Sequence, residues 1–204
     1  MLCAVRIFYV RANNNEFVYG RNNSLNIIKF HMEQIQKQHE RSVGDAFISW
    51  LNTRDGSLFS FKNRGDEAPD LIYEFDDHCQ GIEIVACYYG QDEALMQWQN
   101  ARQRPNAPAE WEGTNFNDAL RTNIELNIAK KCAKAYGNNC ILLVSVRPGL
   151  TTIPKMHEIL SKVVLPAEIT FSGIYVAGEF PFGIDAKGGY YAWQLSGPEL
   201  AKAQ

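Results

Sequence analysis

A continuous apolar run at residues 141–146 constrains the fold more than any other feature of this sequence. The run lies between Asn139 and Pro148, two residues that are typical of turns and strand ends. Its length and composition predict a strand that is buried on both faces. A strand of this kind needs a further layer on each side of its sheet. We therefore expect an α/β protein with a mixed central sheet flanked by helices.

Hydrophobic spacing and turn residues predict the other elements of this sheet and its helices. The first long helix covers 24–51, with Ser24 as N-cap and Gly44 as a candidate break. We expect one domain over residues 1–204. The remaining predicted elements are an N-terminal strand hairpin within 1–20, strands at 58–61, 70–75 and 81–89, a helical piece within 91–113, helices at 117–136 and 154–163, and C-terminal strands at 169–177 and 190–195.

The composition is that of a globular chain, with 46% hydrophobic and 21% charged residues. A net charge of -3 excludes an overall basic field of the kind that attracts nucleic acid. The charge is unevenly spread, however. Residues 1–64 hold nine Lys/Arg against five Asp/Glu, 65–118 hold two against twelve, and 119–204 hold nine against six. An acidic centre between two mildly basic flanks suits either a solvated acidic surface or a cation site.

The sequence also bears on whether the protein is a membrane, secreted, disulfide-rich or zinc-binding protein. No apolar run reaches the roughly 18–20 residues of a membrane span. Because Arg6 and Arg11 interrupt the N-terminal apolar stretch, we expect no secretory signal and a cytoplasmic protein. The five cysteines lack CxxC spacing and the four histidines lack HxxxH or HxH spacing, which argues against a disulfide framework or a zinc enzyme.

Two carboxylates form the candidate site. If the tip of the predicted hairpin lies at Asp76 and Asp77, Asp70 stands directly opposite Glu83. Opposite side chains in a sheet are about 4.5–5.5 Å apart at Cβ, where two like charges repel unless a cation lies between them. Mg²⁺ typically takes one or two carboxylates and keeps several waters. The pair therefore indicates a divalent-cation site.

Glu83 is unusual on its own account, because it interrupts the apolar strand sequence GIEIVAC. An unpaired ionised carboxylate in a buried strand is costly, so such a residue is a metal ligand, a base or a member of a paired network. The structural alternative is an ion pair with Lys62, Lys130 or Lys131.

The residues Pro69-Asp70, the hairpin and then Gly81-Ile82-Glu83-Ile84-Val85 resemble the PD-(D/E)xK motif of the restriction-endonuclease-like nuclease superfamily. The expected order of elements over about 24–147 is similar to the αβββαβ core of that family, with strands added at both ends. The resemblance implies that Asp70, Glu83 and the carbonyl of Ile84 bind Mg²⁺ or Mn²⁺. The metal would activate a water against a phosphodiester.

The sequence departs from the motif at Val85, where the family carries a lysine that polarises water or stabilises phosphate charge. The resemblance implies that the following helix can supply this lysine instead. On the wheel of helix 117–136, Lys131 falls on one border of the apolar arc, whereas Lys130 falls well outside it. We take Lys131 as the replacement, with Lys62 second; the alternative is a Lys131 side chain that extends into solvent.

The first helix adds a further acid. Gln36, His39 and Glu40 share the arc of its apolar residues, so polar groups face inward in mid-helix. The resemblance implies a carboxylate from this helix near the metal, for which Glu40 is best placed and Glu33 second. We interpret His39 as a hydrogen-bonded core histidine.

Three hypotheses follow. The leading one is a Mg²⁺-dependent nuclease acting on DNA, with RNA not excluded, whose catalytic residues are Asp70, Glu83, Lys131 and Glu40. The basic flanks would supply the phosphate contacts, and a homodimer is compatible with the sequence. The second is an inactive protein of the same fold that binds nucleic acid or protein. The third is an unrelated α/β protein in which the carboxylates are merely ion-paired.

Overall fold

The computed structural model describes residues 23–101, 115–136, 139–146, 151–181 and 189–197. Its ten elements form a mixed sheet with helices on both faces, as the sequence predicts. The predicted N-terminal hairpin within 1–20 lies outside the described residues. The elements are α1 (Asn23–Asp55), β1 (Ser60–Arg64), β2 (Leu71–Phe75), β3 (His78–Cys87), α2 (Gln91–Ala101), α3 (Phe116–Cys132), β4 (Cys140–Val146), α4 (Ile153–Leu160), β5 (Gly173–Phe180) and β6 (Gly189–Ser196).

The six strands follow the chain order β1 to β6 across the sheet. The pairs β1–β2, β2–β3 and β5–β6 are antiparallel, whereas β3–β4 and β4–β5 are parallel. The two parallel connections contain α2, α3 and α4, because a parallel crossover must cross a face of the sheet, whereas α1 precedes the sheet. The central strands β3, β4 and β5 therefore form the rigid floor on which the site is built.

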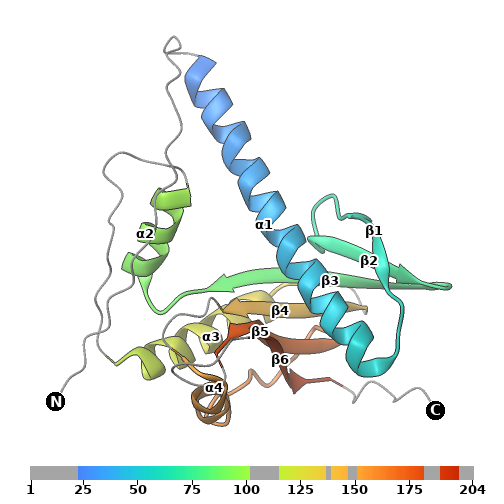
Figure 1. Ribbon diagram of the computed structural model, residues 1–204, viewed down its shortest axis with the longest axis vertical. Helices are drawn as coiled ribbons and strands as arrows, with labels where there is room; N and C mark the ends of the chain where they lie inside the picture. The colour runs from blue at the N-terminus through green and yellow to red at the C-terminus, as the bar shows by residue number, and fades with distance from the viewer. Residues whose placement is uncertain (1–22, 102–114, 137–138, 147–150, 182–188, 198–204) are drawn as a thin grey trace.

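The central strand β4 is buried over its whole length, as its composition predicts. Its alternate residues enter two separate cores. Leu142 and Val144 pack with the apolar side of α3 and α4, whereas Ile141 and Leu143 pack with Phe47 on α1. Figure 1 shows the result, with α1 crossing one face of the sheet and α3 and α4 lying on the other.

The first helix is continuous, and the predicted break at Gly44 is wrong. A Cβ at Gly44 would collide with Leu71 and with the hydroxyl of Tyr73 on β2. The glycine lets α1 approach the sheet closely, and it marks a packing contact rather than a helix end. This close approach is what brings the middle of α1 beside the β1–β2 hairpin.

Several boundaries differ from the predictions. Helix α3 ends at Cys132 with Ala133 as C-cap, so Tyr136 lies beyond the helix. Strand β5 begins at Gly173, and not at the predicted residue 169. Just before the strand, the backbone N–H and the hydroxyl of Ser172 both donate to the Cys140 carbonyl on β4. Within the described ranges, no helix is both long and apolar enough to cross a membrane.

Candidate functional site

The β2–β3 register confirms the predicted hairpin. Its tip lies at Asp76 and Asp77, and the paired residues run from Phe75 with His78 to Leu71 with Ile82. Asp70 precedes the first residue of β2, so the same register brings it opposite Glu83. The backbone N–H of Ile84 donates to Asp70 Oδ2 at 2.8 Å, which fixes the aspartate beside this part of β3.

Strand β3 is longer than β2, so among the described residues the last part of β3 has no strand partner on its β2 side. In the described ladder, β3 pairs with β4 as far as Cys87 but with β2 only as far as Ile82. Beyond that point the Asp70 carboxylate takes the N–H of Ile84 in place of a strand partner. Because the N–H and C=O of a residue point to the same side of an antiparallel ladder, the Ile84 carbonyl also faces this edge.

Glu83 is buried in the middle of β3, where 6% of the residue is exposed. Its Oε1 accepts a hydrogen bond from Lys131 Nζ at 2.5 Å. Its Oε2 is buried and has no hydrogen-bond partner among the described residues. A buried carboxylate oxygen without a partner costs free energy unless a cation or water satisfies it. Oε2 is therefore the atom of this carboxylate at which a cation or a water would supply the missing partner.

Lys131 reaches Glu83 from the last turn of α3. The helix buries Ile128 and Cys132, which come before and after Lys131 in the sequence. Lys131 therefore lies close to the sheet, and its side chain is 22% exposed. The two other lysines considered from the sequence lie elsewhere. Lys130 is exposed, and Lys62 pairs with Glu74 at 3.0 Å on the β1–β2 hairpin. Of the three, the structure brings Lys131 to the carboxylate.

Burial and neighbouring charges shift the pKa values of Asp70 and Lys131. Burial, with smaller contributions from the charges of Glu83 and Glu40, raises the pKa of Asp70 to about 6, although the Ile84 N–H and the charge of Lys131 act in the opposite direction. Burial lowers the pKa of the Lys131 ammonium, but the hydrogen bond and charge of Glu83 outweigh burial, so the net pKa is raised. Lys131 is therefore charged at neutral pH, whereas Asp70 changes its charge at a pH slightly below neutral.

Glu40 does not join the other two carboxylates. It lies on α1, over the opposite face of the sheet, and 7% of it is exposed. Arg64 on β1 forms an ion pair with it, and Gln36 Nε2 donates to its Oε1 at 2.8 Å. Glu40 acts on Asp70 only through its charge. His39 is partly buried and Glu33 is exposed.

Three neighbours of the site were not expected from the sequence. Arg64 neutralises Glu40, and the Tyr136 ring centroid lies 5.9 Å from Lys131 Nζ. The thiol of Cys140, whose pKa burial and the charge of Glu83 raise to about 12, stays protonated beside the carboxylates. The signal for Tyr136 is its position five residues after Lys131. The position of Arg64 depends on a β-bulge, which the sequence does not mark.

The described residues contain no group of three or more His, Cys, Asp or Glu side chains that could hold a metal ion. A Mg²⁺ site needs less, because one or two carboxylates with backbone oxygen and several waters suffice. Asp70, Glu83 and the carbonyl of Ile84 supply donors of this kind at one point of β3. The partnerless Oε2 of Glu83 is the observation that fits a cation here.

Comparisons of this chain with protein-family models, with curated proteins and with solved structures find no match.

Proposed function

We propose that the protein is a divalent-cation-dependent nuclease of the restriction-endonuclease-like class, which hydrolyses phosphodiester bonds of DNA. The observation that carries the proposal is the contact of Lys131 with Glu83, beside Asp70. These are the three side chains that the PD-(D/E)xK resemblance requires, with the lysine supplied by α3 in place of Val85. The order α1, β1, β2, β3, α3, β4 agrees with the proposed core, and α2 is inserted within it.

The metal-binding part of the proposal rests on the donor set. Asp70, Glu83 and the Ile84 carbonyl would hold Mg²⁺ or Mn²⁺, both of which prefer oxygen ligands. When bound, the cation would lower the pKa of a coordinated water and neutralise charge on the phosphate. Glu83 Oε2, buried and partnerless among the described residues, has the acceptor capacity that this role needs.

The side chains of the site divide the remaining work. Lys131 carries a full positive charge, so its ammonium is suited to hold the attacking water or to stabilise the charge that develops on the scissile phosphate. Asp70 must lose its proton before it binds a cation, and the Ile84 N–H favours that charged form. Val85 contributes only to packing against the core.

One observation favours a second candidate, an inactive protein of the same fold. Lys131 already neutralises Glu83 directly, and Glu40 is engaged by Arg64 rather than directed at the other carboxylates. A carboxylate that is permanently paired with lysine would be a structural ion pair and not a ligand. The two candidates differ in whether a cation displaces Lys131 from Glu83 Oε1 or binds beside it.

The test is cleavage of labelled single-stranded DNA, duplex DNA and RNA by the purified chain with Mg²⁺ or Mn²⁺. We expect DNA cleavage that falls at least about 100-fold in Glu83→Gln and in Lys131→Met, because each removes a group that acts on the transition state. Lys130→Met, one residue away and exposed, is the matched control and should retain cleavage. Cation binding without cleavage would support the inactive candidate. Cleavage that survives Glu83→Gln would contradict both.

A further inference from the structure

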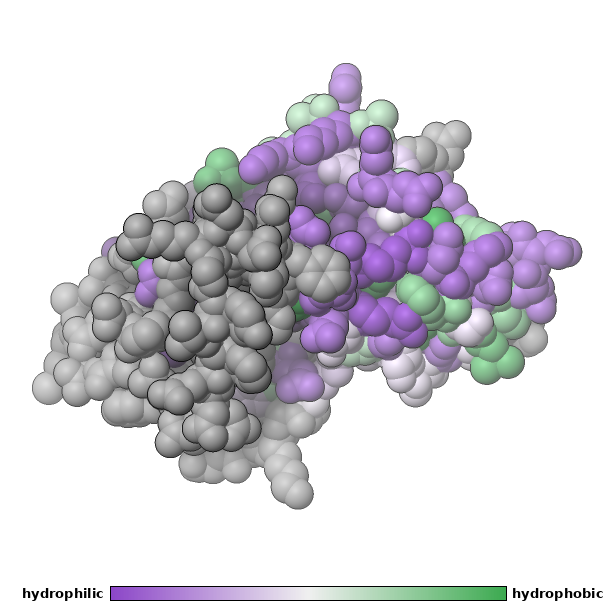
Figure 2. Space-filling view, turned by 90° about the horizontal axis from the view of Figure 1, so that it is seen from above, coloured by the Kyte–Doolittle hydropathy of each residue, from purple (hydrophilic) through white to green (hydrophobic). Residues whose placement is uncertain are grey.

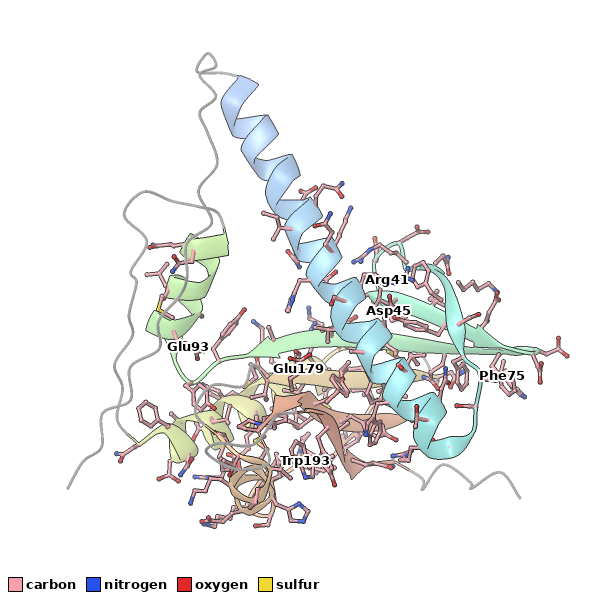
Figure 3. All side chains as sticks on the ribbon, in the orientation of Figure 1. Arg41, Asp45, Phe75, Glu93, Glu179 and Trp193 are labelled. Atoms are coloured by element: carbon pink, nitrogen blue, oxygen red, sulfur yellow. The ribbon has the colours of Figure 1, made fainter. Side chains whose placement is uncertain are left out.

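A basic groove separates the middle of α1 from strand β1. It has a volume of about 560 Å³, and its walls include Lys37, Arg41 and Asp45 on α1 with Phe61 and Arg64 on β1. Figure 3 shows Arg41 and Asp45 on the side of α1 that faces the β1–β2 hairpin. A volume of this size is in the range of small-molecule sites.

The groove is positive in a protein that is negative overall. Three of its lining residues, Lys37, Arg41 and Arg64, are cationic, and Asp45 is the one acidic residue among them, whereas the whole chain has a net charge of -3. A concave surface with a local excess of one charge attracts ligands of the opposite charge. Figure 2, seen from above, shows hydrophilic residues over much of the described surface, with apolar residues among them. The surface therefore suits an anionic ligand.

The groove also contains a planar stack. The guanidinium carbon of Arg41 lies 3.4 Å from the centroid of the Phe61 ring. Arg41 Nε donates to Asp45 Oδ2 at 2.6 Å, and Tyr73 donates its hydroxyl proton to Asp45 Oδ1 at 2.8 Å. These bonds hold the guanidinium over the ring. Nucleic-acid bases stack on such guanidinium planes and on aromatic rings.

One end of the groove lies next to Asp70 along the strands, but on the α1 face of the sheet. Arg64 pairs in register with Leu71, the residue that follows Asp70. The guanidinium of Arg64 is already engaged by the Glu40 carboxylate and by the Lys37 carbonyl, so it closes this end of the groove. Lys37, which is exposed, and Arg41, whose side chain is 40% exposed, remain accessible to a ligand.

We propose that this groove binds one strand of nucleic acid, with backbone phosphates on Lys37 and Arg41 and a base on the Arg41–Phe61 stack. An acidic peptide would use the same cations but would leave the planar stack without a role, so nucleic acid fits the whole groove better. The inference rests on the proposed function, because it names a surface on the α1 face that would hold part of the substrate strand while the scissile phosphate lies at Asp70.

The test is fluorescence anisotropy with labelled 20-nucleotide DNA and RNA, single-stranded and duplex, in EDTA, where cleavage cannot occur. We expect single strands to bind and the double variant Lys37→Gln/Arg41→Gln to bind at least tenfold more weakly. The slope of log affinity against log salt should fall by about 1.4, since each phosphate contact on a single strand contributes about 0.7. The matched control is Lys155→Gln/Lys162→Gln, which changes one lysine on α4 and one just after it, on the other face of the sheet. Their side chains are 41% and 62% exposed, and the control should bind as the wild type does.

A second variant tests the stack. Arg41→Lys keeps the charge but loses the plane, so it should retain the salt slope and lose about fivefold in affinity. The inference is overturned if the wild type does not bind single strands, if the double variant binds as tightly, or if duplex DNA or polyglutamate binds more tightly than single strands. Binding in EDTA without cleavage in Mn²⁺ would contradict the nuclease and leave the groove intact. Cleavage in Mn²⁺ by a protein whose binding is unchanged in Lys37→Gln/Arg41→Gln would support the nuclease and contradict the groove.

Discussion

Lys131 Nζ lies 2.5 Å from Glu83 Oε1, which joins the last turn of α3 to the middle of β3. Both side chains are largely buried, with 22% and 8% of their surface exposed. An ion pair in such a position is not a source of stability by itself, because both charges have lost their hydration. Stability alone therefore gives no reason for this pair, whereas the proposed chemical role does.

Removal of one member of this pair should be more harmful than removal of both. Lys131→Met leaves the Glu83 charge buried and unpaired, so we expect the free energy of unfolding to fall by about 3 kcal/mol. The double variant Lys131→Met/Glu83→Gln should recover most of that loss, and the exposed control Lys130→Met should show none. Urea unfolding measures all three. A Lys131→Met protein as stable as the wild type would show that the pair is not formed.

The stability of the protein should depend on pH through Asp70. Burial raises its pKa to about 6 from an ordinary 3.8, so between these values the folded state keeps a proton that the unfolded state has released. Stability contributed by this group therefore falls as the pH rises from about 4 to 6. Asp70→Asn removes the effect and should be more stable than the wild type at pH 7.5 by about 1 kcal/mol, after allowance for solvent screening, but equal near pH 4.

The control for this pH profile is Asp76→Asn at the exposed hairpin tip, where the positive φ of 50° suits asparagine as well as aspartate. It should follow the wild type at every pH. If Asp70→Asn changes the free energy of unfolding by the same amount at pH 4 and at pH 7.5, the raised pKa of Asp70 is contradicted.

Two ion pairs on β1 should differ in their contribution to stability. Arg64 pairs with a Glu40 side chain that is 10% exposed, whereas Lys62 pairs with a Glu74 side chain that is 43% exposed. We expect Arg64→Met to cost about 3 kcal/mol, because Glu40 is left buried and unpaired. Lys62→Met should cost less than about 1 kcal/mol. Thermal unfolding of the two variants compares them directly, and equal costs would contradict the burial of Glu40.

The parts of the site that follow strand alternation were predictable from the sequence. Once the tip residues Asp76 and Asp77 are identified, the alternation of side chains places Glu83 on one face, and the register brings Asp70 beside it. Helical spacing likewise put Lys131 at the edge of the buried side of α3. Local periodicity carries this information, because it does not depend on how distant elements pack.

Features that depend on tertiary packing were not predictable. A bulge between Phe61 and Asn63 shifts the register of β1 by one residue, so that Arg64, and not Asn63, lies opposite Leu71 and faces Glu40 on α1. Gly44 is similar, since only the approach of β2 distinguishes a packing glycine from a helix break. The basic groove rests on both of these features, because it forms where α1 passes over the displaced strand.

The most direct test of the central claim is Mn²⁺ binding, measured by electron paramagnetic resonance at pH 7.5 and at pH 5 in the wild type and in Glu83→Gln. We predict one saturable site in the wild type, with an affinity about tenfold weaker at pH 5, where Asp70 is mostly protonated, and no site in Glu83→Gln. The absence of saturable binding in the wild type, or equal binding in Glu83→Gln, would contradict the assignment of Asp70 and Glu83 as a divalent-cation site.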